Sequence, residues 1–156
     1  MGEKPLIPAI LATGFGSGYC PVAPGTAGAL LATVIWLAYT LFFPPTTCIV
    51  LTVALTLLFT VLGVWATNKV IPFWGEDPRR VVIDEMVGVW IPLIAAPAGN
   101  LWYALASFVL FRFFDIAKPL GVRQMERFPG GIGVMADDIL AGIYSLFIII
   151  CAQWIL

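Results

Sequence analysis

Five carboxylates in this chain stand beside or inside long apolar stretches, where an acidic side chain is costly. They are the pairs Asp84-Glu85 and Asp137-Asp138 and the single residue Asp115. A charged residue in a membrane-spanning helix costs about 2.5 to 3.5 kcal/mol at the helix centre and less near its ends. Carboxylates that converge also repel one another unless some are protonated or a cation holds them together. The chemistry that these residue types predict is cation binding.

The other residue types favour magnesium as that cation. The chain has no His, and its three Cys residues are too far apart in the sequence for a metal knuckle. Several hard oxygen ligands without nitrogen or sulfur suit Mg²⁺ better than zinc. The alternative is a solvated network at the membrane edge, in which the acidic residues pair with nearby Arg and Lys. For one carboxylate the two interpretations are equally supported, whereas two acidic pairs together with Asp115 favour the metal.

Basic residues close to these carboxylates predict phosphate binding. Arg112, Asp115 and Lys118 follow one another at intervals of three residues, so they share one edge of a helix that should end before Pro119. Arg binds phosphate through a bidentate fork and Lys as a point charge. Further candidates are Arg123, Arg127, Arg79 and Arg80. For the first two of these, anchoring of a short interfacial helix to lipid headgroups is the favoured alternative.

Two glycine-rich segments near the amino terminus, Thr13–Gly18 and Ala23–Gly28, could offer backbone N–H groups to an anion. Thr26 is expected to cap the first long helix and to bind phosphate there. The segments lack the Lys of a P-loop, so the pattern is weak by itself. Beside the acidic clusters it adds a candidate anion site.

Residues that are missing exclude several phosphatase mechanisms. Without His there is no phosphohistidine intermediate, and Thr26 stands six residues after Cys20, where a cysteine phosphatase needs an Arg. The chain also lacks the Asp-x-Asp pair of haloacid dehalogenase phosphatases and the Asp-Gly-x-x-Ala-Arg signature of lipid phosphotransferases. What remains is metal-assisted attack at phosphorus, by water or by an Asp carboxylate.

The elements that must position these residues are membrane helices. Of the 156 residues 61% are hydrophobic and 11% are charged, which is unlike a soluble domain. We expect one all-α, polytopic helical bundle over residues 1–156, with a glycine-rich cytoplasmic segment at residues 1–25. The expected spans are five in number, at about residues 26–43, 47–67, 81–96, 101–114 and 134–156.

Local signals refine these spans. Thr46 or Thr47 is the expected N-cap of the second span, and Asn100 that of the fourth, after a turn at Pro97. The third and fourth spans are short enough to be tilted, re-entrant or packed behind the others. One helical turn after Asp84 and after Asp138 come Gly88 and Gly142, small residues that would let two helices approach closely beside the carboxylates.

All charged residues fall within residues 3–4, 69–85 and 112–138. Five spans bring these three stretches to the same side of the membrane. All eight Lys and Arg residues then lie on one face, which the positive-inside rule places in the cytoplasm together with the amino terminus. A net charge of −1 without a basic run argues against nucleic acid as a partner. The lipid bilayer is the expected partner, and the sequence leaves homo-oligomerisation open.

Five motifs, in order, resemble the phosphatidylglycerophosphatase A family. They lie at Ala12–Gly18, Pro24–Gly28, Ile83–Gly88, Phe111–Pro119 and Gly130–Gly142. The resemblance implies a magnesium-dependent, multi-pass phosphatase of the bacterial inner membrane, with its active site on the cytoplasmic face. Such an enzyme would remove the terminal phosphate of phosphatidylglycerophosphate in phospholipid biosynthesis, giving phosphatidylglycerol and phosphate.

The polar positions of the matching motifs suggest how the site is divided. Asp84, Asp137 and Asp138 are expected to hold Mg²⁺, and Arg112, Lys118 and Thr26 to bind the phosphate. Asp115 or Glu85 is the candidate for general base or nucleophile, with Thr13 as a further catalytic residue.

Two other functions compete with a phosphatase. One is a small cation channel or transporter, which would need acidic residues at several depths of the membrane and gives no reason for the flanking Arg and Lys. The other is a membrane subunit whose charged face docks a partner protein.

Overall fold

The computed structural model of the protein describes residues 2–156, and over these residues it consists of helices without a strand. In chain order they are α1 (Leu6–Ala12), the short 3₁₀ helix η1 (Ser17–Tyr19), α2 (Pro24–Thr40), α3 (Pro45–Trp74), α4 (Ile83–Leu93), α5 (Leu101–Ala117), α6 (Val122–Met125) and α7 (Gly130–Ile155). The prediction of an all-α fold is confirmed.

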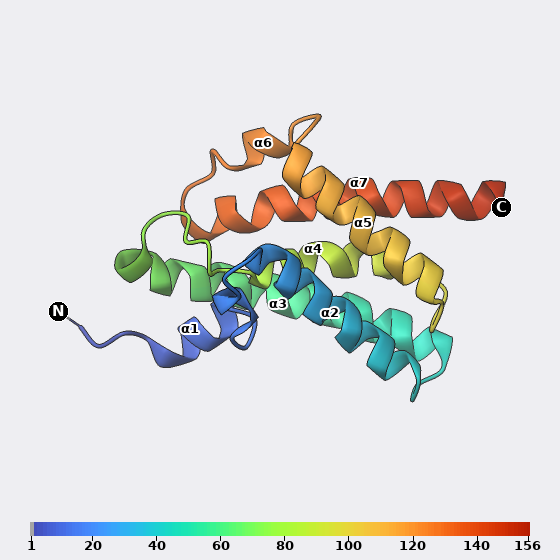
Figure 1. Cartoon of the computed structure of the whole chain (residues 1–156), viewed down its shortest axis with the longest axis horizontal. Coiled ribbons are helices and arrows are strands. Elements are labelled where there is room, and N and C mark those ends of the chain that lie inside the picture. The colour runs from blue at the N-terminus through green and yellow to red at the C-terminus, as the bar shows by residue number, and fades with distance from the viewer. Residues whose placement is uncertain (1) are drawn as a thin grey trace.

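The long helices enclose α4, which packs against α2, α3, α5 and α7 (Figure 1). Ten of its eleven residues are buried, and only Glu85 is partly exposed. Trp90 anchors α4 to α2, because its indole N–H donates to the Ala32 carbonyl at 3.0 Å. At 1.5 Å per residue α4 is about 16 Å long, about half the thickness of the hydrocarbon core. The third expected span is therefore a short, central helix packed behind the others.

Two helices, α3 and α7, are long and apolar enough to cross a membrane, and α2 is a shorter apolar helix. Both long helices extend beyond the expected spans into the neighbouring charged stretches of the sequence. α3 continues past Thr67 to Trp74, with Pro72 in its last turn, and α7 begins at Gly130 instead of Val134. One contact links these two extensions: the Asn68 side-chain oxygen accepts the Gly131 backbone N–H at 2.7 Å. This contact satisfies a free N–H in the first turn of α7.

Of the three helix caps predicted from the sequence, the structure confirms one. Asn100 caps α5, accepting the backbone N–H groups of Trp102 and Tyr103 at 3.0 and 3.2 Å. The cap expected at Thr46 or Thr47 is wrong, because the N-cap of α3 is Pro44 and Pro45 occupies the first helical position, where a missing N–H costs nothing. The cap expected at Thr26 is also wrong.

At the start of α2 the N-cap is Ala23, at φ 103°, and Pro24 occupies the first helical position, where its missing N–H costs nothing. The segment before it, expected only as a glycine-rich stretch, folds into α1 and η1 against α3 and α2.

Candidate active site

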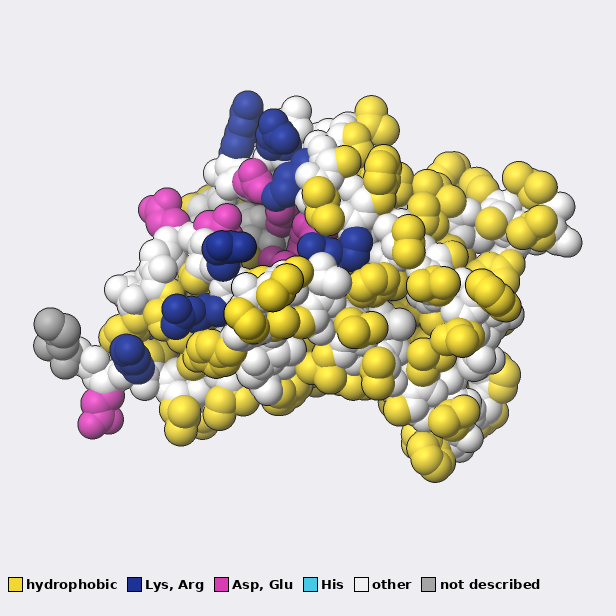
Figure 2. Space-filling model, in the orientation of Figure 1, with side chains coloured by type: hydrophobic (Ala, Val, Ile, Leu, Met, Phe, Trp, Pro, Cys, Tyr) yellow, Lys and Arg dark blue, Asp and Glu magenta, His cyan; other side chains and the backbone are white. Residues whose placement is uncertain are grey.

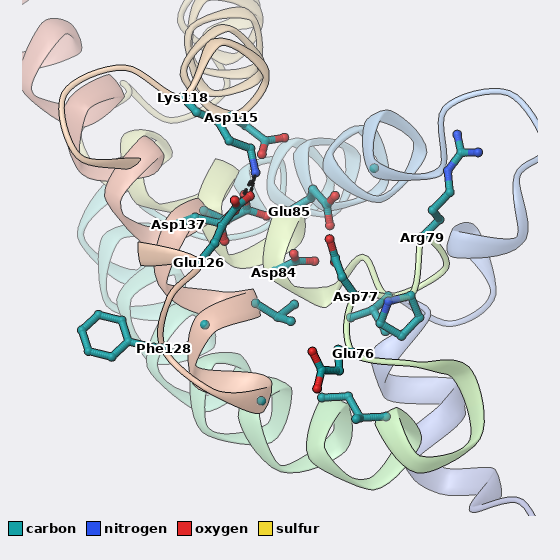
Figure 3. Close-up of a pocket in the computed structure, with 18 of the residues that line it drawn as sticks. Glu76, Asp77, Arg79, Asp84, Glu85, Asp115, Lys118, Glu126, Phe128 and Asp137 are labelled. Atoms are coloured by element: carbon teal, nitrogen blue, oxygen red, sulfur yellow. Dashed lines mark hydrogen bonds and ion pairs between the residues drawn. The ribbon is translucent and has the colours of Figure 1, made fainter. Parts of the chain in front are cut away.

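A cavity of about 700 Å³ lies at one end of the bundle and gathers most of the charged residues (Figure 3). It is bounded by the start of α2, the loop between α3 and α4, the start of α4, the end of α5, and the segment from Glu126 into α7. Figure 2 shows charged side chains around this hollow, while the opposite end of the visible face is hydrophobic. The titratable residues that line it are Glu76, Asp77, Arg79, Asp84, Glu85, Arg112, Asp115, Lys118, Glu126, Arg127, Asp137 and Asp138.

The five carboxylates singled out in the sequence converge in this cavity. Among the described residues they form two groups of three, within each of which one oxygen per residue lies within 4.8 Å of the others. The first group is Asp84, Glu85 and Asp138; the second is Asp115, Asp137 and Asp138. Asp138 belongs to both.

Burial makes this convergence costly unless something compensates the charge. Asp84, Asp137 and Asp138 are 8%, 7% and 2% exposed. Each of them has one buried oxygen without a hydrogen-bond partner among the described residues, and so has Glu85. A buried carboxylate whose charge is not fully compensated costs several kcal/mol. Because the donor set is all oxygen, it suits a hard divalent cation such as Mg²⁺.

Two glycines bring the acidic parts of α4 and α7 together. A Cβ added at Gly142 of α7 would lie 2.5 Å from the Gly88 carbonyl oxygen of α4. A Cβ added at Gly88 would overlap the Phe111 ring and lie 3.0 Å from the Asp138 carbonyl oxygen. The close helix approach predicted from these glycines is confirmed, and it occurs one turn from Asp84 and from Asp138.

Gly88→Ala should therefore damage the site without touching a charge. The added methyl group must push Phe111 or α7 away, and overpacking of this kind costs about 1 to 3 kcal/mol. We expect a lower thermal unfolding temperature and a loss of activity larger than the loss of folded protein. Equal activity per folded molecule in the variant and the wild type would contradict the idea that this contact sets the carboxylate spacing.

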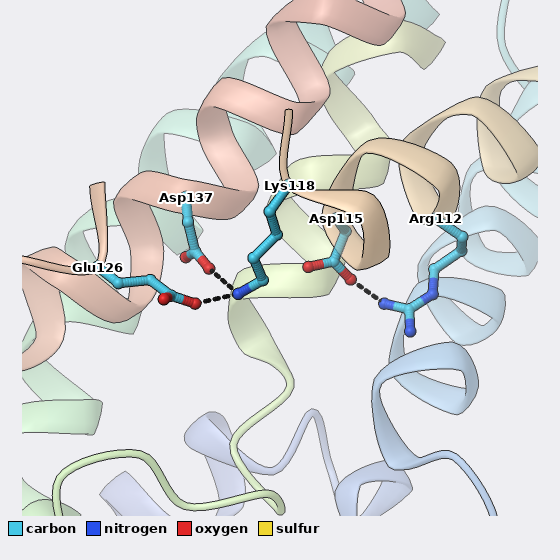
Figure 4. Close-up of polar contacts among 5 residues, drawn as sticks. All are labelled: Arg112, Asp115, Lys118, Glu126 and Asp137. Atoms are coloured by element: carbon cyan, nitrogen blue, oxygen red, sulfur yellow. Dashed lines mark hydrogen bonds and ion pairs between the residues drawn. The ribbon is translucent and has the colours of Figure 1, made fainter. Parts of the chain in front are cut away.

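The predicted helix edge of Arg112, Asp115 and Lys118 is present at the end of α5 (Figure 4). Arg112 donates to the Asp115 carboxylate. Lys118, the C-cap of α5 at φ 49°, turns toward α7 and donates to Asp137 at 3.1 Å and also to Glu126. Both cations therefore stand beside the carboxylate groups.

Lys118 keeps its charge over the whole physiological range. Burial acts to lower the pKa of its ammonium, but the hydrogen bonds and charges of Glu126 and Asp137 outweigh burial and raise that pKa above its ordinary value. The ammonium therefore remains a donor at every pH at which a free lysine would be protonated.

Two of the predicted site residues lie away from the cavity lining. Thr13 is buried in the turn after α1, where its hydroxyl donates to the Ala9 carbonyl at 2.8 Å and accepts the Gly16 N–H at 3.3 Å. Thr26 lies one residue beyond Ala23, Pro24 and Gly25, which do line the cavity.

The further basic candidates are divided in the same way. Arg79 and Arg127 line the cavity, whereas Arg80 and Arg123 do not. Arg80 instead lies over the rings of Tyr19 and Trp74, 5.7 and 5.1 Å from their centroids.

The sequence did not single out Glu126, the second partner of Lys118. The two residues meet because the chain reverses direction through left-handed backbone conformations at Lys118, Leu120 and Gly121. Gly121 was the one visible signal of that reversal. Asp77 also lines the cavity and was also missed. It lies in a loop, where no periodic pattern indicates the direction of a side chain.

Residues 10–153 match the family model described as phosphatidylglycerophosphatase A. The chain belongs to the phosphatidylglycerophosphatase A family. Two relatives with this name come from Escherichia coli strain K12 and Haemophilus influenzae, each 39% identical. The E. coli alignment covers 87% of this chain and 77% of the relative, and the H. influenzae alignment covers 93% and 88%.

Another relative, from Bacteroides thetaiotaomicron, is 56% identical over 158 residues, covering 100% of this chain and 99% of the relative. Its name is "putative phosphatidylinositol-3-phosphatase". No solved structure matches the chain.

Membership in the phosphatidylglycerophosphatase A family confirms the resemblance drawn from the five motifs. The protein is thus a lipid phosphatase of this family, and its two long apolar helices associate it with a membrane. The channel interpretation required carboxylates at several depths, whereas all five converge around one cavity.

Proposed function

We propose that this protein is a Mg²⁺-dependent phosphatase that converts phosphatidylglycerophosphate into phosphatidylglycerol and inorganic phosphate. The observation that carries the proposal is the joint presence, in one cavity, of buried carboxylate oxygens that have no hydrogen-bond partner among the described residues and of two cations beside them, Arg112 and Lys118. Carboxylates that hold a metal, next to donors for phosphate oxygens, are what hydrolysis of a phosphomonoester needs.

The proposed topology has five spans, with α4 as a half-length element, and the cavity at the cytoplasmic surface of the bacterial inner membrane. Four of the eight Lys and Arg residues line the cavity, and the other four belong to the charged stretches that five spans would bring to the same side, in agreement with the positive-inside rule. A phosphomonoester on a lipid headgroup lies at the depth of this cavity if α3 and α7 cross the bilayer. The lipid tails can then stay in the hydrocarbon while the phosphate enters.

In the proposed mechanism Asp84, Asp137 and Asp138 would hold the cation, with Glu85 and Asp115 as the remaining members of the two groups. Bound Mg²⁺ would polarise the phosphoryl group and acidify water. Arg112 and Lys118 bind the phosphate oxygens and stabilise charge as the P–O bond to the glycerol breaks. The glycerol oxygen leaves with a proton, and phosphate gains the oxygen of water.

Asp115 is the proposed general base or nucleophile, with Glu85 as the alternative. Arg112 donates to one oxygen of Asp115, which holds this carboxylate beside the proposed phosphate position. Acid quenching of a single turnover with ³²P-labelled substrate distinguishes the two roles, because only a nucleophile leaves label on the protein. Asp115→Asn is the matched control for such label.

Thr13 and Thr26 are proposed to act through position. The turn that Thr13 stabilises is bound to the start of α4, since the Val82 N–H donates to the Ala12 carbonyl at 2.8 Å. Thr26 lies in the first turn of α2, whose first residues form a wall of the cavity. Both would place the anion-binding backbone without contacting substrate through their hydroxyl groups.

Arg112→Gln should lower kcat/KM for phosphate release by about 10²- to 10³-fold, the usual effect of removing one donor to a developing negative charge. Arg112→Lys should recover part of this loss, because it restores the charge without the bidentate fork. Initial rates over a range of lipid concentrations in mixed micelles measure the effect. Wild-type kcat/KM in the Gln variant would remove Arg112 from the phosphate site.

The second candidate substrate is phosphatidylinositol 3-phosphate, which the name of the B. thetaiotaomicron relative favours. Both lipids present a phosphomonoester to the same cavity, on a primary glycerol hydroxyl in one case and on an inositol ring in the other. Phosphate release from the two lipids, with matched acyl chains and equal surface concentrations, separates the candidates. We expect kcat/KM at least about tenfold higher for phosphatidylglycerophosphate, which is about 1.4 kcal/mol. The opposite preference would assign the second function, and release from neither lipid would overturn both.

A further inference from the structure

We infer that the site holds two divalent cations, with Asp138 as the ligand that bridges them. This inference rests on the proposed function for its catalytic meaning, and on geometry for the sites themselves. One cation would be bound by the group of Asp84, Glu85 and Asp138, the other by the group of Asp115, Asp137 and Asp138.

The arrangement of free oxygens supports two positions. Asp84 and Asp137, one from each group, both line the cavity, and each carries a buried oxygen without a hydrogen-bond partner among the described residues. Both residues are more than nine-tenths buried. Asp138, only 2% exposed, contributes a further oxygen of this kind where the groups meet. A single ion cannot satisfy all of them together with Glu85 and Asp115, because Mg²⁺ keeps an octahedral shell and usually retains several waters.

The distances are compatible with this assignment. An Mg²⁺–O distance of about 2.0 to 2.1 Å allows two ligand oxygens to be at most about 4.2 Å apart. The oxygens of each group lie within 4.8 Å of one another, so each group needs only a small contraction to close on an ion. The three elements that carry the groups are held together independently of the ions, by the Gly88 and Gly142 contact and by the packing of α5 on α7.

The charge of the cavity also supports two divalent cations. Its lining contains eight Asp and Glu residues against four Arg and Lys residues, a formal excess of four negative charges. With one divalent cation the cavity would still repel a phosphomonoester dianion. Two cations would cancel the formal excess and admit it.

Mn²⁺ binding to the detergent-purified, full-length protein tests this inference without any lipid. Equilibrium dialysis should give two Mn²⁺ per chain at saturation, and the electron paramagnetic resonance spectrum at two equivalents should show the exchange coupling of ions that share a bridging ligand. Asp138→Asn should abolish the coupling and weaken both sites. Glu85→Gln should weaken the first site and leave the other, so that about one tightly bound Mn²⁺ remains.

Glu76→Gln is the matched control, because Glu76 lines the cavity but belongs to neither group. It should keep two coupled ions. One Mn²⁺ per wild-type chain at saturation, or two uncoupled ions that Asp138→Asn does not affect, would overturn the inference.

Phosphate release from phosphatidylglycerophosphate by the same samples keeps this result separate from the proposed function. Two coupled ions without release would leave the ion sites standing and reject the function. Phosphate release by a protein that binds only one ion would support the function and reject the second ion site.

Discussion

Asp138→Asn should reduce phosphate release by about a thousandfold or more, equivalent to about 4 kcal/mol of transition-state stabilisation. Asp138 is the carboxylate shared by both acidic groups, and the residue is 2% exposed. Asn has nearly the same shape, so packing against α4 should survive. It lacks the negative charge, and its amide N–H₂ would face other carboxylates instead of a cation.

Phosphate release in a single turnover measures this effect, because it does not depend on product dissociation. Circular dichroism and size-exclusion chromatography of the same preparation establish that the variant folds. Glu76→Gln serves as the comparison, since it removes an exposed carboxylate outside both groups and should stay close to wild-type activity. Full activity in the Asp138→Asn variant would reject the metal-assisted mechanism proposed for this cavity.

The part of the site that lies on regular helices could be predicted from the sequence. The interval of three between Arg112, Asp115 and Lys118 gave their common edge, because helical periodicity is a local property. Gly88 and Gly142 indicated where α4 and α7 would touch, because a small residue within a membrane helix leaves space for a neighbour. The convergence of the five carboxylates followed from placing the helix ends on one side.

The parts that depend on loop conformation could not be predicted. Ala23, at φ 103°, and Lys118, at φ 49°, adopt left-handed conformations that residues other than glycine rarely adopt. No sequence rule therefore places the turns there. These turns begin α2 before Thr26 and direct Lys118 toward Glu126. The tertiary fold imposes these turns, and they place Ala23 and Lys118 in the lining of the cavity.

The half-length of α4 has a similar explanation. Its apolar residues satisfy any hydropathy rule for a span, and the sequence does not state that neighbours surround them. Burial of Trp90 and Leu93 against α2 and the other helices shows that the apolar run faces protein rather than lipid. Packing of α4 against four other helices also fixes Asp84 and Glu85 rigidly, which suits a site that must hold charges at a set spacing.

Removing divalent cations with EDTA should abolish phosphate release and lower the unfolding temperature of the wild-type protein. Bound at a hundred times its dissociation constant, one cation stabilises the folded state by about 2.7 kcal/mol. For a chain of this size that amounts to about 5 to 10 °C. Scanning fluorimetry of the six Trp residues measures the shift, and excess Mg²⁺ should restore both temperature and activity.

The Asp138→Asn variant shows whether that shift arises at the carboxylates. In EDTA it should unfold at a higher temperature than the wild type, because one buried charge that repels its neighbours is gone, and added Mg²⁺ should raise the temperature little. An equal EDTA effect in both proteins would place the cation elsewhere, and no effect in either would favour a network of paired charges over a metal. If the variant is the more stable protein without metal and the less active one with it, the acidic cluster is maintained at a cost in stability for the sake of cation binding.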